Sequence, residues 1–292
     1  MNGVINVFKN TGMTSFDVVR IIKKLAGTGK VGHTGTLDPE ASGVLPICIG
    51  KATKIIDYIM DSKKVYEVEL RLGIKTTTYD LEGDIIEEKD CSRLTKEMVA
   101  EAINSFKGEY LQVPPMYSAL KQNGVRLYEL ARKGIEVHRD GRLINIYNIE
   151  IKAINLPYAT MEVTCSKGTY IRSLCYDIGE KLEVGGTMSK LKRSQTSKFK
   201  EEEAININDL TKENVEKYLI SIEDALDTYD KLVVLNKFSE LLINGVNVFD
   251  KRFTNENYIE GKLYRVYNED RKFIGLGRGE EKAFKIEKLL IV

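Results

Sequence analysis

Apolar residues alternate with polar ones, or gather in short runs, at several places along the chain, and both patterns predict β-strands. The strictest alternation covers residues 66–72, where Tyr66 lies on the apolar face. Because successive side chains of a strand point to opposite faces, Tyr66 is expected to face the interior. Further strands are predicted at residues 3–8, 44–49, 144–154, 159–165, 264–267 and 273–277.

Apolar residues at helical spacing predict the helices. Thr14 and Asp17 have the sequence of a capping box, so a helix is expected to start there and to end before Gly27. The acidic residues 209–227 are expected to form a connecting helix. Strands and helices are mixed without regular strand–helix–strand alternation, which favours an α+β fold over a doubly wound sheet. Other helices are predicted at residues 52–59, 99–106 and 171–178.

Charge divides the chain more sharply than its total suggests. The 292 residues carry 44 basic and 43 acidic side chains, a formal net charge of +1. Residues 1–200 have a net charge of +6, residues 201–229 of −7, and residues 230–292 of +2. A binding partner responds to the local electric field and not to the total charge of the chain. The near-neutral total therefore does not exclude a basic binding surface within residues 1–200. We expect a catalytic domain at 1–229, ending in an acidic connector at 201–229, and a small β-rich domain at 230–292.

Composition argues against several classes of protein. No apolar run reaches the roughly 18 to 20 residues that a membrane helix needs, and the first residues lack the profile of a signal peptide. The four cysteines form no CxxC pair and lie in or beside apolar runs, as small hydrophobic residues do. A cytoplasmic protein with reduced thiols and no membrane partner is therefore expected.

The histidines limit the chemistry. There are two, His33 and His138, so a three-histidine or HExxH metal site cannot be built. The reacting groups are expected to be carboxylate, tyrosine or lysine side chains, acting without a metal.

Residues 27–32 match the dinucleotide-binding pattern GxGxxG. That motif requires a preceding strand and a helix that opens at its end, because the helix N-terminus holds the pyrophosphate. Here a helix precedes the glycines and more loop follows. An enzyme that uses a nucleotide cofactor is kept as the third hypothesis.

The same glycine-rich loop contains Asp38, between Leu37 and Pro39. Proline restricts the preceding residue to extended conformations, so the direction of the Asp38 carboxylate is fixed. The alternative is an ordinary Asp-Pro turn. Two other candidates have similar alternatives, since Arg172 could be a solvated surface charge and Tyr66 a core tyrosine.

Four segments together resemble a known family. The segments are GHTGTLDPEASG at 32–43, KVY at 64–66, YSALK at 117–121 and CSKGTYIR at 165–172. In order and spacing they resemble the bacterial tRNA pseudouridine-55 synthases, the TruB family, over residues 3 to about 200. The resemblance implies the pseudouridine synthase fold, with a mixed and largely antiparallel sheet flanked by helices. The tail resembles the PUA-type RNA-binding module that many members carry.

The resemblance also implies an activity and site residues. Family members detach uracil from its ribose, rotate it and rejoin it through C5, without ATP, metal or redox cofactor. Asp38 matches the essential aspartate, and Arg172 matches the basic residue that pairs with it. Tyr66 matches the tyrosine that stacks on the target base, which is extruded from its loop. The remaining matches are His33, associated with base flipping, and Tyr170 and Leu191, which line the uridine pocket; ordinary core packing is the alternative for Leu191.

Basic residues are expected to contact the RNA backbone. The run at 190–200 holds five basic residues and no acidic one, and its alternative is a solvated edge strand protected by lysines. The segment 121–142, which has turn signals at residues 122–124 and 139–141, is a second candidate that could close on the tRNA. The expected partner is the T-arm of tRNA, bound by a monomer. The residues expected to contact RNA are Lys64, Lys121, Lys190, Lys192 and Arg193.

Three positions depart from the family pattern. Phe8 replaces an aspartate, Asn10 replaces a proline, and Thr77 stands where an aspartate is common. These positions support the catalytic loop, so they bear on the rigidity of the pocket or the turnover rate more than on the type of reaction. They lend some support to a second hypothesis, a protein that binds and refolds tRNA without chemistry.

Overall fold

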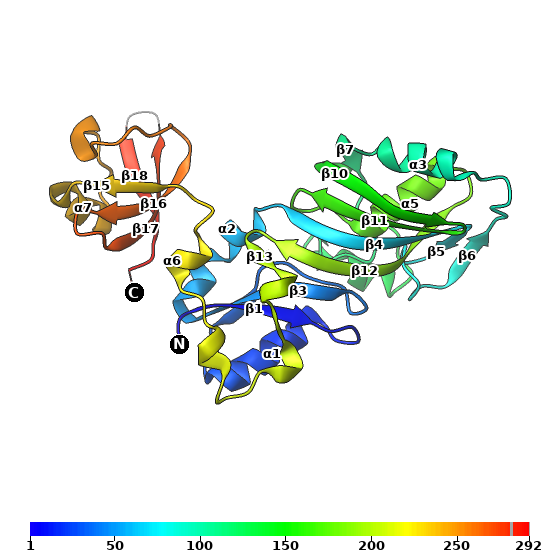
Figure 1. Ribbon diagram of the computed structural model, residues 1–292, viewed down its shortest axis with the longest axis horizontal. Helices are drawn as coiled ribbons and strands as arrows, with labels where there is room; N and C mark the ends of the chain where they lie inside the picture. The colour runs from blue at the N-terminus through cyan, green and yellow to red at the C-terminus, as the bar shows by residue number, and fades with distance from the viewer. Residues whose placement is uncertain (281–282, 292) are drawn as a thin grey trace.

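The computed structural model describes residues 1–280 and 283–291, which form two main β-sheets with helices around them (Figure 1). The larger sheet contains β1 (Gly3–Lys9), β2 (Val31–His33), β3 (Ser42–Ile49), β4 (Lys64–Leu72), β7 (Gly108–Gln112), β10 (Arg142–Asn155), β11 (Tyr158–Cys165), β12 (Gly186–Thr196), β13 (Phe199–Lys200) and β14 (Ile205–Asn206). The smaller sheet contains β15 (Lys231–Val234), β16 (Leu263–Asn268), β17 (Phe273–Glu280) and β18 (Ala283–Leu289). Two hairpins pair β5 (Ile74–Thr76) with β6 (Ile85–Glu88) and β8 (Lys121–Gln122) with β9 (Val125–Arg126).

The helices are short. No helix in the described part of the chain is long and apolar enough to cross a membrane. The α-helices are α1 (Ser15–Ala26), α2 (Ile56–Met60), α3 (Lys96–Asn104), α4 (Leu127–Ala131), α5 (Ile171–Lys181), α6 (Ile222–Ala225) and α7 (Asn236–Ile243). The 3₁₀ helices are η1 (Gly50–Ile55), η2 (Glu201–Glu203), η3 (Ile207–Asp209), η4 (Val215–Tyr218) and η5 (Lys251–Phe253).

The larger sheet is mixed and mostly antiparallel, in the order β14-β1-β3-β12-β4-β11-β10-β7. Only the pairs β1–β14 and β12–β3 are parallel among its described strands. This topology confirms the expected α+β fold class. It also places β12 in the middle of the sheet, so the edge-strand alternative for the basic run was wrong.

Strand β4 shows why the sheet buries one face. Its residues alternate strictly, and Tyr66, Val68 and Leu70 belong to the main core together with Leu174 and Ile178 of α5. The polar residues Glu67 and Glu69 lie on the other face. The predicted inward placement of Tyr66 is thus confirmed, and α5 covers the side of the sheet on which Tyr66 lies.

Helix α1 begins and ends as its sequence predicts. The Thr14 side chain accepts a hydrogen bond from the Asp17 backbone N–H, and the Asp17 carboxylate accepts one from the Thr14 N–H, which completes the capping box. Gly27 ends the helix with a φ of 63°, a left-handed conformation that glycine adopts without strain. Strand β2, not a helix, follows the glycines, so the context of a dinucleotide motif is absent here.

Two helix predictions need correction. Residues 52–59 begin as the 3₁₀ helix η1 and become α-helical only at Ile56. The acidic segment 209–227 is not one helix, because it contains η4 and α6 separated by extended residues.

The smaller sheet lies beside the larger one (Figure 1), and it has its own core and a packed junction with the rest of the chain. Leu276 and Leu290 pack into a cluster with residues of β3, α2 and α6. The Arg265 side chain donates hydrogen bonds to the carbonyls of Tyr229 at 2.9 Å, Asp227 at 3.3 Å and Glu223 at 3.4 Å. The acidic segment therefore docks the smaller sheet onto the larger one.

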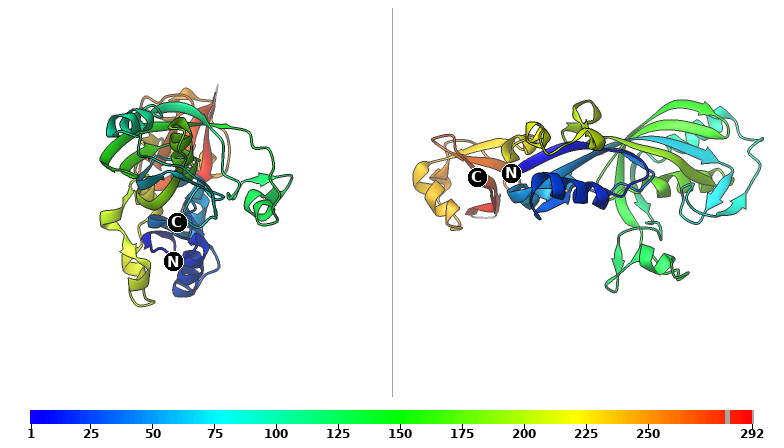
Figure 2. Two further views of the ribbon diagram at one scale, coloured as in Figure 1. Left: turned by 90° about the vertical axis from the view of Figure 1, so that its right-hand side faces the viewer. Right: turned by 90° about the horizontal axis from the view of Figure 1, so that it is seen from below.

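Figure 2 shows the segment that holds β8, β9 and α4 projecting from the body. Its hairpin turns at Asn123 and Gly124, whose φ angles are 50° and 84°. Both are left-handed, as a two-residue Asn-Gly turn requires. The turn predicted within 121–142 is confirmed.

Candidate active site

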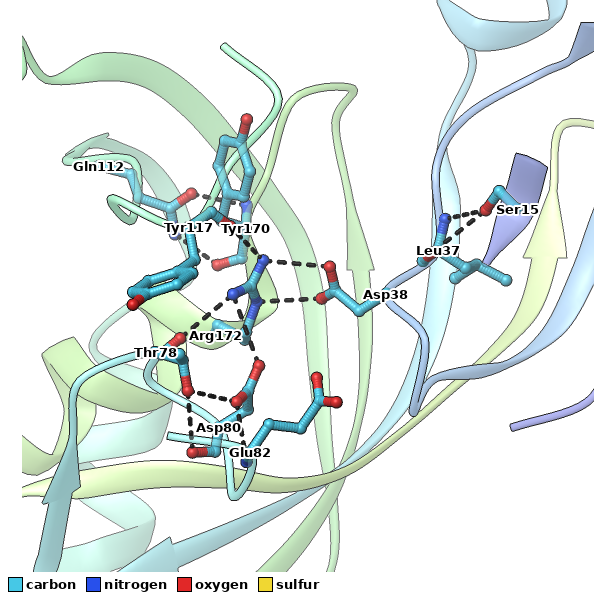
Figure 3. A network of polar contacts seen from close by, with 10 residues as sticks. All are labelled: Ser15, Leu37, Asp38, Thr78, Asp80, Glu82, Gln112, Tyr117, Tyr170 and Arg172. Carbon is cyan, nitrogen blue, oxygen red and sulfur yellow. Dashed lines mark hydrogen bonds and ion pairs between the residues drawn. The ribbon is translucent and has the colours of Figure 1, made fainter. Parts of the chain in front are cut away.

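Asp38 lies on a loop whose backbone is held on both sides of it, and Figure 3 shows the contacts between Ser15 and Leu37 on one side. The Ser15 hydroxyl accepts a hydrogen bond from the Leu37 N–H at 2.8 Å and donates one to the Leu37 carbonyl at 3.1 Å. On the other side, the Lys9 ammonium donates to the Pro39 carbonyl at 3.0 Å. Both Ser15 and Lys9 are buried, so the direction of the carboxylate is fixed by groups that solvent does not disturb.

Arg172 contacts the Asp38 carboxylate through two nitrogens. Its Nε lies 3.0 Å from one oxygen and its Nη2 lies 3.1 Å from the other. Arg172 is the second residue of α5, and its side chain is 8% exposed. A two-point pair of this kind fixes orientation as well as charge, because the planar guanidinium matches the two oxygens. The structure thus brings together two residues that are far apart in sequence, as expected.

The Arg172 side chain has three further acceptors. Its Nη1 donates to the Thr78 carbonyl at 3.2 Å, and its Nη2 donates to the Tyr117 carbonyl at 2.9 Å. Its Nη1 also lies 3.5 Å from an oxygen of Asp80, a second carboxylate that is 10% exposed. Asp80 was not among the residues expected at the site. Its signal in the sequence is an aspartate at the end of the TTTYD segment, residues 76–80, which also contains Thr77.

Burial dominates the electrostatics at Asp38. It raises the pKa of this carboxyl above its usual value, and the charge of Arg172 acts in the opposite direction. The nearby Asp80 carboxylate raises the pKa of Asp38 further. Arg172 therefore favours the ionised form of Asp38, against both burial and a like charge.

Tyr66 lies close to this pair but is covered. It is 7% exposed, and burial raises the pKa of its hydroxyl, which is also sensitive to the charges of Arg193 and Asp38. Its hydroxyl is therefore neutral. An aromatic face becomes available to a base only if the groups that cover the ring move aside.

The other expected pocket residues lie around the same loop. His33 accepts a hydrogen bond at Nδ1 from the Gly35 N–H at 3.2 Å, and burial lowers its pKa. The Tyr170 backbone is held from both sides by the Gln112 amide, which donates to its carbonyl at 3.0 Å and accepts from its N–H at 2.8 Å. Leu191 is half-buried against the main core, so both its pocket role and its packing role are compatible with its position.

A cleft of about 1010 Å³ opens beside Asp38 and runs along β4, β11 and β12. Asp38, Asp80 and Leu191 line it, whereas Tyr66, His33, Tyr170 and Arg172 do not. Its charged lining is mostly acidic, with seven carboxylates and three lysines. These are Asp38, Glu40, Glu67, Glu69, Asp80, Glu82 and Glu162, with Lys152, Lys190 and Lys192.

The lysines of the basic run are paired with carboxylates. Lys190 lies 3.2 Å from Glu69 on β4, and its side chain is 78% exposed. Lys192 lies 3.0 Å from Glu67 and 2.9 Å from Glu201. The run that has no acidic residue in sequence is therefore partly neutralised in space. Because Glu201 opens the acidic segment, that segment begins in contact with the basic run.

Two of the residues expected to contact RNA are buried. Lys64 is 7% exposed, and its ammonium donates to the carbonyls of Met60 and Ser62 at the end of α2. Arg193 is 1% exposed and belongs to the core. Neither side chain offers a surface to a phosphate in this structure, so burial argues against both expected contacts. Lys121, by contrast, is exposed on the projecting hairpin.

The departures from the family pattern lie outside the Asp38–Arg172 pair. Asn10 exchanges two amide hydrogen bonds with Asn206, at 2.9 and 3.0 Å. Thr77 is exposed, and its N–H donates to the Asp84 carbonyl. Phe8 is half-buried on β1, where it is in register with Asn206. The altered residues thus support neighbouring segments and leave the paired side chains intact.

Comparison with known families agrees with this geometry. The family model described as TruB family pseudouridylate synthase (N terminal domain) matches residues 23–171. The chain belongs to the TruB family. The model described as tRNA pseudouridylate synthase B C-terminal domain matches residues 172–233 and so extends past the acidic segment into β15. Members of the family are pseudouridylate synthases, so the comparison supports an enzyme and not the refolding protein of the second hypothesis.

Relatives named tRNA pseudouridine synthase B align over the whole chain. The protein of Clostridium perfringens strain 13 is 64% identical over 292 residues, which cover 100% of this chain and 99% of the relative. The protein of Clostridium tetani is 56% identical, with 100% of both chains covered. That of Clostridium acetobutylicum is 53% identical, with 99% of this chain and 100% of the relative covered.

Solved structures show the same fold. The crystal structure of a Cbf5-Nop10-Gar1 complex matches with a TM-score of 0.76 at 27% identity, covering 99% of this chain and 84% of that chain. The structure of an H/ACA RNP bound to a substrate RNA containing 2'-deoxyuridine matches with a TM-score of 0.74 at 25% identity, covering 99% and 85%. The expected pseudouridine synthase fold is confirmed.

Proposed function

We propose that this TruB-family chain converts uridine-55 in the T-loop of tRNA to pseudouridine, with Asp38 as its essential carboxylate. The observation that carries the proposal is the two-point pair between Asp38 and Arg172 at the wall of a cleft. The pair supplies an anion of fixed direction in a desolvated place, which a nucleophile or base needs. The names of the relatives, which include tRNA, support the choice of substrate.

The reaction is an isomerisation in which the substrate exchanges only protons with the solvent. The bond between uracil N1 and ribose C1′ breaks, and a bond between C5 and C1′ forms. C5 gives up its proton to solvent, and N1 takes one up. Asp38 acts as an anion, whether it attacks C1′, attacks the pyrimidine or removes a sugar proton. Because no electrons are gained or lost, the residues around Asp38 need only bind, orient and stabilise charge.

The base must leave its loop to reach Asp38, at a cost of a few kcal/mol. We assign the aromatic wall for the extruded base to Tyr66, with Tyr170 and Leu191 as further pocket residues. His33 is assigned to the space that the base leaves, because its ring can stack and hydrogen-bond. Since Tyr66 is covered in this structure, entry of the base requires the covering groups to separate.

RNA-backbone contacts are assigned to the exposed lysines. Lys121 and Lys190 are exposed and can reach phosphates, Lys190 by leaving Glu69, and Lys192 can do so by leaving its two carboxylate partners. The smaller sheet is assigned as a PUA-like module at residues 230–292, joined to a catalytic domain at 1–229. The enzyme is proposed to act as a monomer in the cytoplasm.

The test uses tRNA carrying tritium at uridine C5, because only completed isomerisation releases it. Asp38→Asn removes the anion with almost no change in size. We expect tritium release to be abolished while the Kd for tRNA stays close to that of the unchanged protein. The control is Asp90→Asn, an exposed aspartate outside the cleft that should leave the rate unchanged.

Retained tritium release by Asp38→Asn would refute the catalytic assignment. If the unchanged protein binds and refolds tRNA without releasing tritium, the refolding hypothesis would replace the proposed function. Calorimetric binding of NAD or NADP would instead revive the third hypothesis. Sequencing of the product for pseudouridine identifies the modified position.

A further inference from the structure

Arg193 occupies the place where the two proposed catalytic elements meet. It lies on β12, with Gly43 of β3 as its partner on one side and Tyr66 of β4 on the other. Gly43 has a φ of 115°, and a Cβ there would collide with the Arg193 backbone. The strand that carries Arg193 thus packs directly against the end of the Asp38 loop.

The Arg193 guanidinium holds both ends of that loop. Its Nε donates to the Val44 carbonyl at 2.8 Å, and its Nη2 donates to the Gly35 carbonyl at 3.1 Å. Gly35 and Val44 bracket the residues that include Asp38. A single rigid fork therefore sets the distance between the loop ends.

This arginine is costly to the fold. None of the ion pairs between described residues involves Arg193, although its side chain is 1% exposed. Its neighbours include two more buried cations, and its charge contributes to lowering the pKa of Lys9 and of Lys64 to about 8, for which burial is the main cause. Burying a charge costs free energy unless the charge is paired and hydrogen-bonded, and here hydrogen bonds to carbonyls offset that cost without an ion pair. A role in stability alone does not account for Arg193.

We propose that Arg193 is a positioning residue that fixes the Asp38 loop relative to Tyr66. Its fork ties the loop ends together, and its strand carries them alongside β4. The inference rests on the proposed function, because Asp38 and Tyr66 must be the groups that act on the uridine. A shift of the loop by about 1 Å would be enough to reduce turnover by about 100-fold.

The experiment compares Arg193→Met with Arg265→Met. Both are buried arginines that donate to backbone carbonyls, but Arg265 lies at the junction with the smaller sheet. The readouts are the single-turnover rate of tritium release at saturating enzyme, the Kd for tRNA, and the Tm. Arg193→Lys, which keeps the charge without the fork, is the third variant. The unchanged protein and Asp38→Asn are measured beside them.

We expect Arg193→Met to lower the rate by about 100-fold. Its Kd for tRNA should change little, and its Tm should fall no further than that of Arg265→Met. Arg265→Met should keep the rate of the unchanged protein at saturating enzyme. Arg193→Lys should keep its Tm but remain slower than the unchanged protein, because one ammonium cannot replace the fork.

A normal rate for Arg193→Met would overturn the inference. If Arg193→Met lowers both the Tm and the rate of tritium release, the Arg193→Lys variant distinguishes positioning from a purely structural role. A lysine variant that is stable but slow supports positioning, whereas one that restores both shows a purely structural role and overturns it. Turnover by Asp38→Asn would instead show that the proposed function has failed, whatever the arginine variants do.

Discussion

Replacing Arg172 with lysine keeps a positive charge beside Asp38 but removes the fork. The arginine uses Nε and Nη2 for the two Asp38 oxygens, at 3.0 and 3.1 Å. A lysine ammonium is a compact charge that can keep one of these contacts. Loss of one hydrogen bond to a charged group costs about 1.5 to 3 kcal/mol. If that loss is felt in the transition state, the rate falls by about 10- to 150-fold.

The same substitution changes the pH dependence. Burial already raises the pKa of Asp38, and Arg172 is the main group that opposes this rise. With fewer hydrogen bonds to the carboxylate, its pKa rises further, so more of it is protonated at a given low pH. Because the anion is the active form, the acid limb of the rate profile should move to higher pH.

Single-turnover tritium release measured over a pH series reports both effects. We expect Arg172→Lys to show a lower plateau and an acid limb displaced upward. The Tm should also fall, because the Thr78 and Tyr117 carbonyls lose their donors, at about 1 kcal/mol each. A plateau and an acid limb equal to those of the unchanged protein would refute the reasoning that the fork keeps Asp38 ionised.

Two further predictions use the carboxylates near the site. Asp80→Asn removes a like charge that raises the pKa of Asp38. The acid limb of the rate profile should therefore move to lower pH, in the direction opposite to that expected for Arg172→Lys. An upward shift in the same pH series would contradict this. Glu69→Gln releases Lys190 and should tighten tRNA binding at low salt, whereas Lys190→Ala should weaken it and lower the slope of log K against log salt by about 0.9. Filter binding over a salt series measures both, and a flat salt dependence of the unchanged protein would count against phosphate contacts by these lysines.

Local signals in the sequence predict most elements of the larger sheet. The capping box at Thr14, the strict alternation of β4 and the Asn-Gly turn at Asn123 each depend on residues close in sequence. Local geometry therefore determines them, and the structure confirms each one. The pairing of Asp38 with Arg172 was also expected, because each residue lies in a distinctive segment that resembles the family.

Other features depend on which segments meet in space. Asp80 belongs to the site only because its loop reaches Arg172 on α5. Arg193 lies beside the Asp38 loop only because β12 is in the middle of the sheet. The charge of a side chain says nothing about its depth, so Arg193 and Lys64 looked like surface cations. The prediction of one helix for the acidic segment was wrong for a similar reason. The short turns of this segment are stabilised by partners distant in sequence, such as Arg265.

The positions of the charges bear on how the proposed enzyme would select a base. Cations lie behind the Asp38 loop, at Lys9 and Arg193, while the cleft in front of it is lined mainly by carboxylates. An acidic cleft repels phosphate, so it disfavours entry of the RNA backbone beside Asp38. The extruded base is assigned to Tyr66, which does not line this cleft and becomes accessible only after the groups over its ring separate. Phosphates must then be held at the rim and beyond, by exposed side chains such as Lys190 and Lys121. Replacing carboxylates of the cleft with neutral residues should therefore lower the Kd for RNA. It should also let more RNA bind in complexes that do not place a uridine at Asp38.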